Sequence, residues 1–301
     1  GPLREPLFSG SATITGGRVR HFSLPNSLDQ INGVVYFDPR GIRLDEVTAT
    51  MGGGQVQFGG RIGFKGYTPG DLNVTVSGES VRLRYPEGVR SQIDADLVVR
   101  GPYKTPTLGG TVTVRNAVWN KRIEPTAGLF DFGGGSAAGS ATVATPTVPL
   151  RFDIRVLVPS TLHIDNNLIE NMVARADLQL RGTYDRPILY GRAEVDRGIV
   201  RFEGRRYMIS RGTIDFTNPT RIEPFFDVEA ETTVRVPRQT YRVIVSAAGT
   251  PDHLQPQLSS DPPLPAGDVV TLLFSDVRRG QDVELRARQN PNERQTDILT
   301  T

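Results

Sequence analysis

Hydrophobic and polar residues alternate with a period of two through most of the chain. The longest run covers residues 226–236, in which Phe226, Val228 and Ala230 alternate with Asp227 and Glu229. Because successive side chains of a strand point to opposite faces, this run predicts a strand with one apolar face and one polar face.

The same alternation recurs along the chain, for example at 72–77, 93–100, 152–158, 174–180 and 241–246. Glycine- and proline-containing segments such as 38–41 and 52–54, together with the Gly16-Gly17 pair, predict the turns between strands. The pattern indicates an all-β protein of about sixteen strands, which at about 4.8 Å per strand forms a sheet on the order of 75 Å long.

Part of the pattern is an internal repeat. Residues 97–118 align without gaps to residues 178–199, and a weaker third copy begins at Val245. In the two clear copies, Gly101 corresponds to Gly182. Repetition of a strand module predicts an open sheet that grows strand by strand rather than a closed barrel.

The pattern also predicts a division of the chain into two parts. Residues 1–265 form the repetitive sheet, interrupted at 127–147 by a Gly/Ala/Ser-rich loop that we expect to be flexible. Residues 266–301 form a helical C-terminal segment that looks truncated, with a short helix over Val269 to Ser275 capped by Asp268.

Composition narrows the possible functions. The 35 basic and 33 acidic residues are interspersed and leave a net charge of +2, so no segregated basic face is available to bind nucleic acid. Cysteine is absent, which does not distinguish a reducing from an oxidising compartment. No run approaches the roughly 18 apolar residues of a membrane span.

The sequence contains no convincing catalytic or metal-binding constellation. His21, His163 and His253 are far apart and lack partners at ligand spacing. Two carboxylate pairs, Asp94/Asp96 and Glu229/Glu231, fall on the polar face of their strands, where solvated acids are usual; a carbohydrate-active β-sandwich that uses them is the weaker alternative. We therefore expect no enzyme activity, no metal and no cofactor.

The apolar face of the sheet has to be hidden, because its exposure to water costs about 25 cal/mol per Å². With almost no helix to cover it, the sheet either folds face to face as a sandwich or curls into a trough with an apolar interior. The residues alone favour neither. A trough would suit a lipid tail, since moving about sixteen methylenes through water costs on the order of 13 kcal/mol.

Three motifs in the last third of the chain resemble one known family. They are Leu189 to Gly204 with the form G-x-x-x-V-x-x-G-x-V-x-F, then Gly212 to Phe216 with Pro224 to Asp227 behind it, and finally Ser260 to Leu264 leading into Asp268 to Leu273. In order and spacing they resemble the C-terminal domain of TamB, an AsmA-like family of bridge-like proteins in the envelope of diderm bacteria.

The resemblance implies an all-β fold, a long open twisted sheet curled into a U-shaped trough (β-taco) with an apolar inner face and a short helix near the C-terminus. It implies a periplasmic location, with an inner-membrane anchor N-terminal to this segment. The implied function is a conduit that moves phospholipid between the inner and outer membranes, with the acyl chains in the groove. The alternative is an assembly factor for outer-membrane β-barrel proteins that binds a TamA-like barrel through its C-terminal part, residues 268–301, or through its strand edges.

For the conduit, the alternation predicts which residues line the groove. They are Leu72, Val74, Val76, Val112, Val114, Phe152, Ile154, Val156, Phe226, Val228, Val234, Tyr241, Val243 and Val245. On this hypothesis, Val228→Asp or Val243→Asp blocks lipid passage and leaves a folded domain.

Overall fold

The computed structural model describes residues 9–20, 26–66, 68–84, 88–122, 150–237, 239–251 and 253–273. They form one sheet of fourteen strands and one short helix, residues 266–273. The strands are β1 (Gly10–Val19), β2 (Leu28–Asp38), β3 (Gly41–Met51), β4 (Gly54–Lys65), β5 (Thr68–Leu83), β6 (Val89–Pro102), β7 (Thr107–Trp119), β8 (Arg151–Ile164), β9 (Ile169–Thr183), β10 (Pro187–Phe202), β11 (Arg205–Phe216), β12 (Pro224–Val236), β13 (Gln239–Thr250) and β14 (His253–Asp261).

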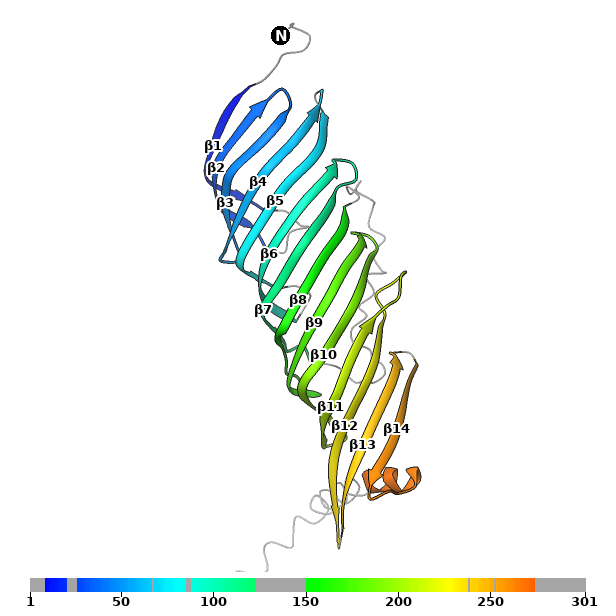
Figure 1. Ribbon diagram of the computed structural model, residues 1–301. Coiled ribbons are helices and arrows are strands. Elements are labelled where there is room, and N and C mark those ends of the chain that lie inside the picture. Colours follow the sequence, from blue (N-terminus) through cyan, green and yellow to red (C-terminus); the bar gives the residue numbers. More distant parts are fainter. Residues whose placement is uncertain are drawn as a thin grey trace, which may run out of the picture.

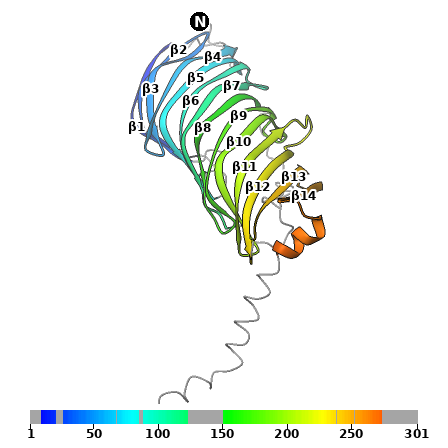
Figure 2. The ribbon, with the colours of Figure 1, turned by 60° about the horizontal axis from the view of Figure 1, so that its bottom comes forward.

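The order of strands in the sheet is their order in the chain, from β1 to β14. All neighbours are antiparallel except β7 and β8, which are parallel. The segment joining these two strands contains the predicted 127–147 loop, which lies outside the described residues. The sheet is open and curls about its long axis, so its strands are bowed and one face is concave (Figures 1 and 2). This confirms the predicted all-β, open and curled architecture.

A line of β-bulges produces much of this curvature. In several strands of the first two thirds of the sheet, one residue has a positive φ, namely Gln30, Glu46, Ser80, Ser160 and Asn171. The first four coincide with register shifts in β2, β3, β5 and β8. An extra residue on one strand bends it and increases its twist. The pairings of β12 with β13 and of β13 with β14 contain no such shift.

Glycines add bends at equivalent places in the two repeat copies, which fold as the hairpins β6–β7 and β9–β10. Gly110 and Gly191 have φ of +129° and +119°. A Cβ at Gly110 would lie 2.1 Å from the carbonyl oxygen of Asp96, and one at Gly191 would lie 2.2 Å from that of Asp177. Only glycine permits both this conformation and this close approach of two backbones.

Some predicted turns are in fact bulges. The Gly16-Gly17 pair was expected to separate two strands, but β1 continues through it, with a φ of +63° at Gly16. The runs on either side of Ser80 are likewise one strand, β5. Prediction of a turn was wrong at Gly16-Gly17 because a bulge interrupts the alternation without ending the strand. The described residues contain fourteen strands, against about sixteen expected for the whole chain.

The helix near the C-terminus is present, but it begins earlier than predicted. It covers residues 266–273, and the backbone N–H groups of Asp268 and Val269 both donate to the carbonyl oxygen of Pro265, at 2.9 and 3.1 Å. Asp268 therefore belongs to the first turn and does not cap the helix. Residues 274–301 lie outside the described residues.

Candidate functional site

The concave face of the sheet carries an almost entirely apolar surface that crosses many strands. Paired residues of neighbouring strands share a face, so the register traces rows across the sheet. One row crosses β1 to β10 as Ala12, Val35, Leu44, Gly60, Val74, Val99, Leu108, Phe152, Gly182 and Pro187. The next rows are similarly apolar; one of them runs through Phe58, Val76, Leu97, Gly110, Ile154, Leu180 and Leu189. We call this surface the inner face.

All fourteen residues expected to line a groove lie on the inner face. In β5, β7 and β8 they form adjacent positions of the rows: Leu72, Val74, Val76, Val112, Val114, Phe152, Ile154 and Val156. In β12 and β13 they are Phe226, Val228, Val234, Tyr241, Val243 and Val245. Their exposure differs: Val74 and Val156 are half-buried, whereas Val234 and Val243 are fully buried.

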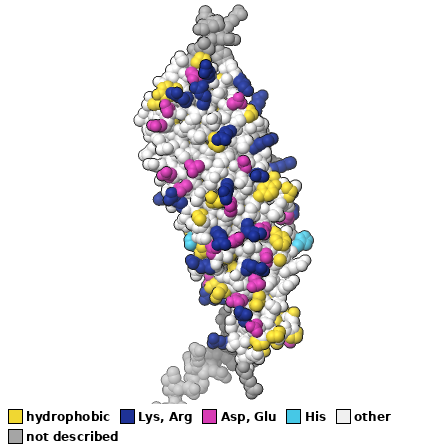
Figure 3. Space-filling view, viewed as in Figure 1, with side chains coloured by type: hydrophobic (Ala, Val, Ile, Leu, Met, Phe, Trp, Pro, Cys, Tyr) yellow, Lys and Arg dark blue, Asp and Glu magenta, His cyan; other side chains and the backbone are white. Residues whose placement is uncertain are grey.

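The opposite, convex face is polar and carries cross-strand ion pairs (Figure 3). Arg155 donates two hydrogen bonds to Asp177, at 2.9 and 2.6 Å, and Arg192 donates two to Asp215, at 2.6 and 3.1 Å. The hydrogen bonds from Arg155 lower the pKa of Asp177. The pairs are exposed to solvent, where each contributes little to stability, so this face needs no further cover.

The two carboxylate pairs lie on this convex face. Asp94 accepts a 2.9 Å hydrogen bond from the backbone N–H of Ser80 and another from Arg115, and these interactions lower its pKa. Glu229 accepts a 3.1 Å hydrogen bond from the Ser210 hydroxyl. Asp94 and Glu229 are thus engaged in the ordinary contacts of a sheet surface, and Glu231 lies 3.8 Å from Arg242.

Two of the three histidines lie in the part of the chain that the structure describes. His163 lies on β8 and His253 begins β14, while His21 lies outside the described residues. Within the part of the chain that the structure describes, no three residues among His, Cys, Asp and Glu are grouped closely enough to hold a metal ion.

The C-terminal helix lies on the inner face of the last strands. Val269 is 0% exposed and Leu273 is buried; they pack with Tyr207, Val234 and Val243 in a cluster that also contains Ala230. Burial in this cluster raises the pKa of the Tyr207 hydroxyl. Arg205 donates a 2.8 Å hydrogen bond to the carbonyl oxygen of Leu273, which ties the helix to β11. We call β11–β14 with this helix the covered section, and β1–β10 the open section.

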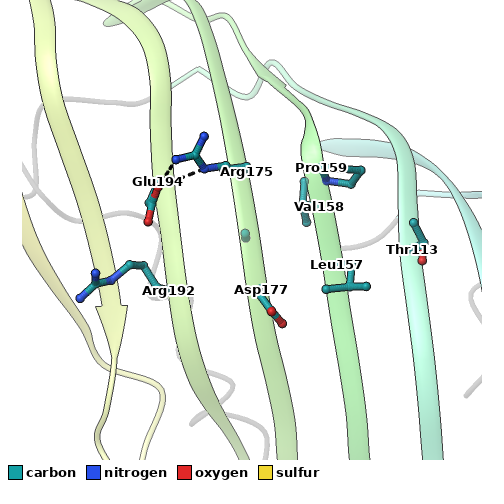
Figure 4. Close-up of a pocket in the computed structure, with 9 residues that line it drawn as sticks. Thr113, Leu157, Val158, Pro159, Arg175, Asp177, Arg192 and Glu194 are labelled. Carbon is teal, nitrogen blue, oxygen red and sulfur yellow. Dashed lines mark hydrogen bonds and ion pairs between the residues drawn. The ribbon is translucent and has the colours of Figure 1, made fainter.

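A shallow depression interrupts the convex face between β7 and β10 (Figure 4). Leu157 and Pro159 form its apolar part, and Arg175, Asp177 and Arg192 surround it. Arg175 is bonded to Glu194 and to Asp196, the latter at 3.0 Å. Arg175 pairs with Glu194 inside the depression, whereas Asp177 and Arg192 pair with residues outside it. Since these charged groups already have partners, this depression is not a convergent binding site.

Sequence reasoning missed two features of this site. The first is the set of bulges. At a bulge the inner-face residues of one strand no longer follow a strict period of two, for instance between Val158 and Leu162. The cover provided by Val269 and Leu273 was also missed; their spacing of four, typical of one helix face, was the available signal.

No helix among the described residues is both long enough and apolar enough to cross a membrane. The model of the TamB C-terminal domain family matches residues 45–296, which is most of the chain and includes β4 to β14. The three sequence motifs, the open curled sheet and this match agree. The chain belongs to the TamB C-terminal domain family, a periplasmic family of non-enzymatic proteins that act in outer-membrane protein assembly and lipid transport.

Proposed function

We propose that this domain is a conduit for phospholipid, whose acyl chains slide along the inner face of the open section between the inner and outer membranes. The observation that carries the proposal is the unbroken apolar row from Ala12 to Pro187. It passes through ten strands, and most of its members, such as Val74 and Phe152, are only half-buried.

The energetics support a mobile lipid. Each methylene kept out of water contributes about 0.8 kcal/mol, so an acyl chain gains from contact anywhere along the face. The lining residues are mainly Val, Leu, Ile, Phe, Ala and Gly, and no convergent polar group fixes one position. Such a surface binds an acyl chain without a single strong site, which suits movement of the lipid along the sheet better than tight binding at one position.

The conduit is tested by measuring the phospholipid that copurifies with the domain. We expect Val74→Asp and Val156→Asp to lower the bound lipid about tenfold or more, because a carboxylate next to hydrocarbon costs more than about 1.4 kcal/mol. Thr75→Asp is the matched control, since Thr75 lies next to Val74 on the convex face, and should retain lipid. Equal retention by Val74→Asp and Thr75→Asp would contradict the conduit.

Val243→Asp, which the sequence had suggested as a test of passage, is unsuitable for that purpose. Val243 is 0% exposed and packs with the helix. An acid there disrupts the core of the covered section, so any loss of lipid would report unfolding.

One observation favours the alternative of an assembly factor for barrel proteins that acts with a TamA-like partner. β14 pairs with β13 on one side, and among the described residues no strand pairs with its other side. An edge strand with free N–H and C=O groups can add a strand of another protein.

Site-specific photo-crosslinking from Gln255 and Gln257 of β14 tests this alternative. Assembly by strand addition predicts crosslinks to the barrel partner from these positions and no lipid crosslinks from Val74. Deletion of residues 268–301 is a poorer test, because it also removes Val269 and Leu273 and uncovers the core.

A further inference from the structure

Three parts of the sheet are hydrogen-bonded together at one rim of the open section. The backbone N–H of Arg151, at the start of β8, donates to the carbonyl oxygen of Pro106 in the β6–β7 turn, at 2.9 Å. The N–H of Tyr184 in the β9–β10 turn donates to the carbonyl oxygen of Leu150, at 3.0 Å. These bonds hold the β6–β7 turn and the β9–β10 turn on either side of the start of β8. The side chains of the two turns and of Arg151 therefore lie close together.

This rim carries four basic side chains without a carboxylate partner. Arg100, Lys104, Arg151 and Arg186 are all exposed, and among the described residues none of them has an ion pair. Arg100 and Arg151 both pair with Thr107, so two strand spacings, roughly 10 Å, separate them. We call these four residues the basic rim.

Nearby carboxylates do not neutralise the basic rim. Asp153 lies 3.6 Å from Arg181 and accepts a 2.7 Å hydrogen bond from Gln179, and Asp71 lies 3.7 Å from Lys65. Asp185, in the β9–β10 turn, is a single carboxylate beside four basic residues, so the rim keeps a net positive charge. Figure 3 shows basic and hydrophobic side chains along the edge of the molecule on which the β6–β7 and β9–β10 turns lie.

Two tyrosines accompany the basic rim at equivalent places of the repeat. Tyr103 is 45% exposed and Tyr184 is 54% exposed. Tyrosine is enriched where hydrocarbon meets water, since its ring is apolar and its hydroxyl is polar. One residue inward, the polarity changes: Arg151 faces outward, whereas Phe152 lies on the inner face beside Leu108.

We propose that the basic rim binds the phosphate head group of a phospholipid whose acyl chains lie on the inner face. This inference rests on the conduit function proposed above. Arginine and lysine are strong donors to phosphate oxygens, and arginine can bind them in bidentate fashion. A lipid is the fitting source of that phosphate because the apolar row begins within one residue of the charges, as a molecule with a charged head and an apolar tail requires.

The test measures binding of three probes to the full chain at low salt: dihexanoyl phosphatidylglycerol below its micellar concentration, dihexanoylglycerol, and inorganic phosphate. The variant is Lys104→Gln/Arg151→Gln/Arg186→Gln. The control, Arg90→Gln/Arg197→Gln/Arg235→Gln, removes the same charge from exposed residues of the convex face elsewhere on the sheet.

We expect the rim variant to lose about tenfold or more in affinity for the phospholipid and to bind dihexanoylglycerol as the wild type does. The control variant should bind the phospholipid with an affinity within about twofold of the wild type. Equal losses in the two variants would overturn the proposal, as would equal wild-type affinity for phospholipid and dihexanoylglycerol. Phosphate that binds as tightly as the phospholipid would assign the rim to a free anion instead. If neither lipid binds the wild type, the conduit itself fails, which is a distinct result.

Discussion

The open and covered sections are built from the same alternating strands, yet they hide their inner faces differently. In the open section the strands are bowed by bulges, such as those at Ser80 and Ser160, and no helix of the described part of the chain packs on the row through Val74. In the covered section β12, β13 and β14 pair without register shifts, and Val269 and Leu273 pack against buried residues of their inner face.

The comparison teaches that an apolar sheet face needs a cover, and that among the described residues the only helix that supplies one lies at the C-terminal end of the sheet. The helix, residues 266–273, buries Val234 and Val243 of the covered section. The open section has many more strands and, among the described residues, no comparable helix. On our proposal lipid takes the place there that Val269 and Leu273 take in the covered section.

The largest expected effect is a difference between equivalent acids in the two sections. Val243→Asp places an unpaired charge in the buried cluster and should lower the free energy of unfolding by about 4 kcal/mol or more. Val74→Asp, at a half-buried position, should cost about 1 kcal/mol. Urea unfolding of both variants measures the difference. Equal losses would mean that the inner face is packed by protein along its whole length.

A somewhat smaller effect should separate Gly110, at a bend of the open section, from Gly204, in the turn between β10 and β11. Gly110→Ala places a Cβ 2.1 Å from a backbone oxygen and should destabilise the fold by about 3 kcal/mol. Gly204→Ala, at a φ of +73° with no atom within 4 Å of the added Cβ, should cost about 1 kcal/mol. Thermal or urea unfolding compares them. If Gly110→Ala were no worse than Gly204→Ala, the close strand approach at this bend would be refuted.

The cover itself can be tested with two neighbouring valines of the helix. Val269 is 0% exposed, whereas Val270 is 41% exposed. Val269→Ala removes buried methyl groups and should cost about 2 kcal/mol, whereas Val270→Ala should cost less than about 0.5 kcal/mol. Equal, small effects on the unfolding free energy would show that the helix does not stabilise the last strands.

The smallest effect concerns acid stability at a bulge of the open section. The N–H of Ser80, followed by Arg115, lowers the pKa of Asp94 below its ordinary value of 3.8. A carboxylate with a lowered folded-state pKa stabilises the fold above the unfolded-state value and ceases to do so as the pH falls through the folded-state value.

Asp94→Asn should therefore have a lower free energy of unfolding than the wild type at pH 7. Its free energy of unfolding should also fall less than that of the wild type as the pH drops from about 4 to the lower folded-state pKa. Asp96→Asn, from the same strand and face, is the control. The urea midpoint at a series of pH values measures both. An unchanged acid decline in Asp94→Asn would contradict the role of this carboxylate at the bulge.

Much of this fold followed from the sequence because a period of two is a direct record of which residues share a face. It placed Val74, Val156 and Val243 on one side of one open sheet. It could not record where a strand bends without ending, so the bulge within β5 and the passage of β1 through Gly16 required the coordinates.

The candidate site was predicted as a set of residues, but its division into open and covered parts was not. Val74 and Val243 have the same local pattern, and only the packing of the distant helix distinguishes them. The basic rim was likewise out of reach, since it depends on the hydrogen-bonded association of turns about eighty residues apart.

The most direct test of the account is photo-crosslinking to lipid in cells from single positions in the two sections. We predict lipid crosslinks from Val156, on the open inner face, and none from Arg155, its neighbour on the convex face, or from Val243, under the helix. Crosslinks of equal yield from Val156 and Arg155, or none from Val156 in a folded and stable protein, would contradict the conduit.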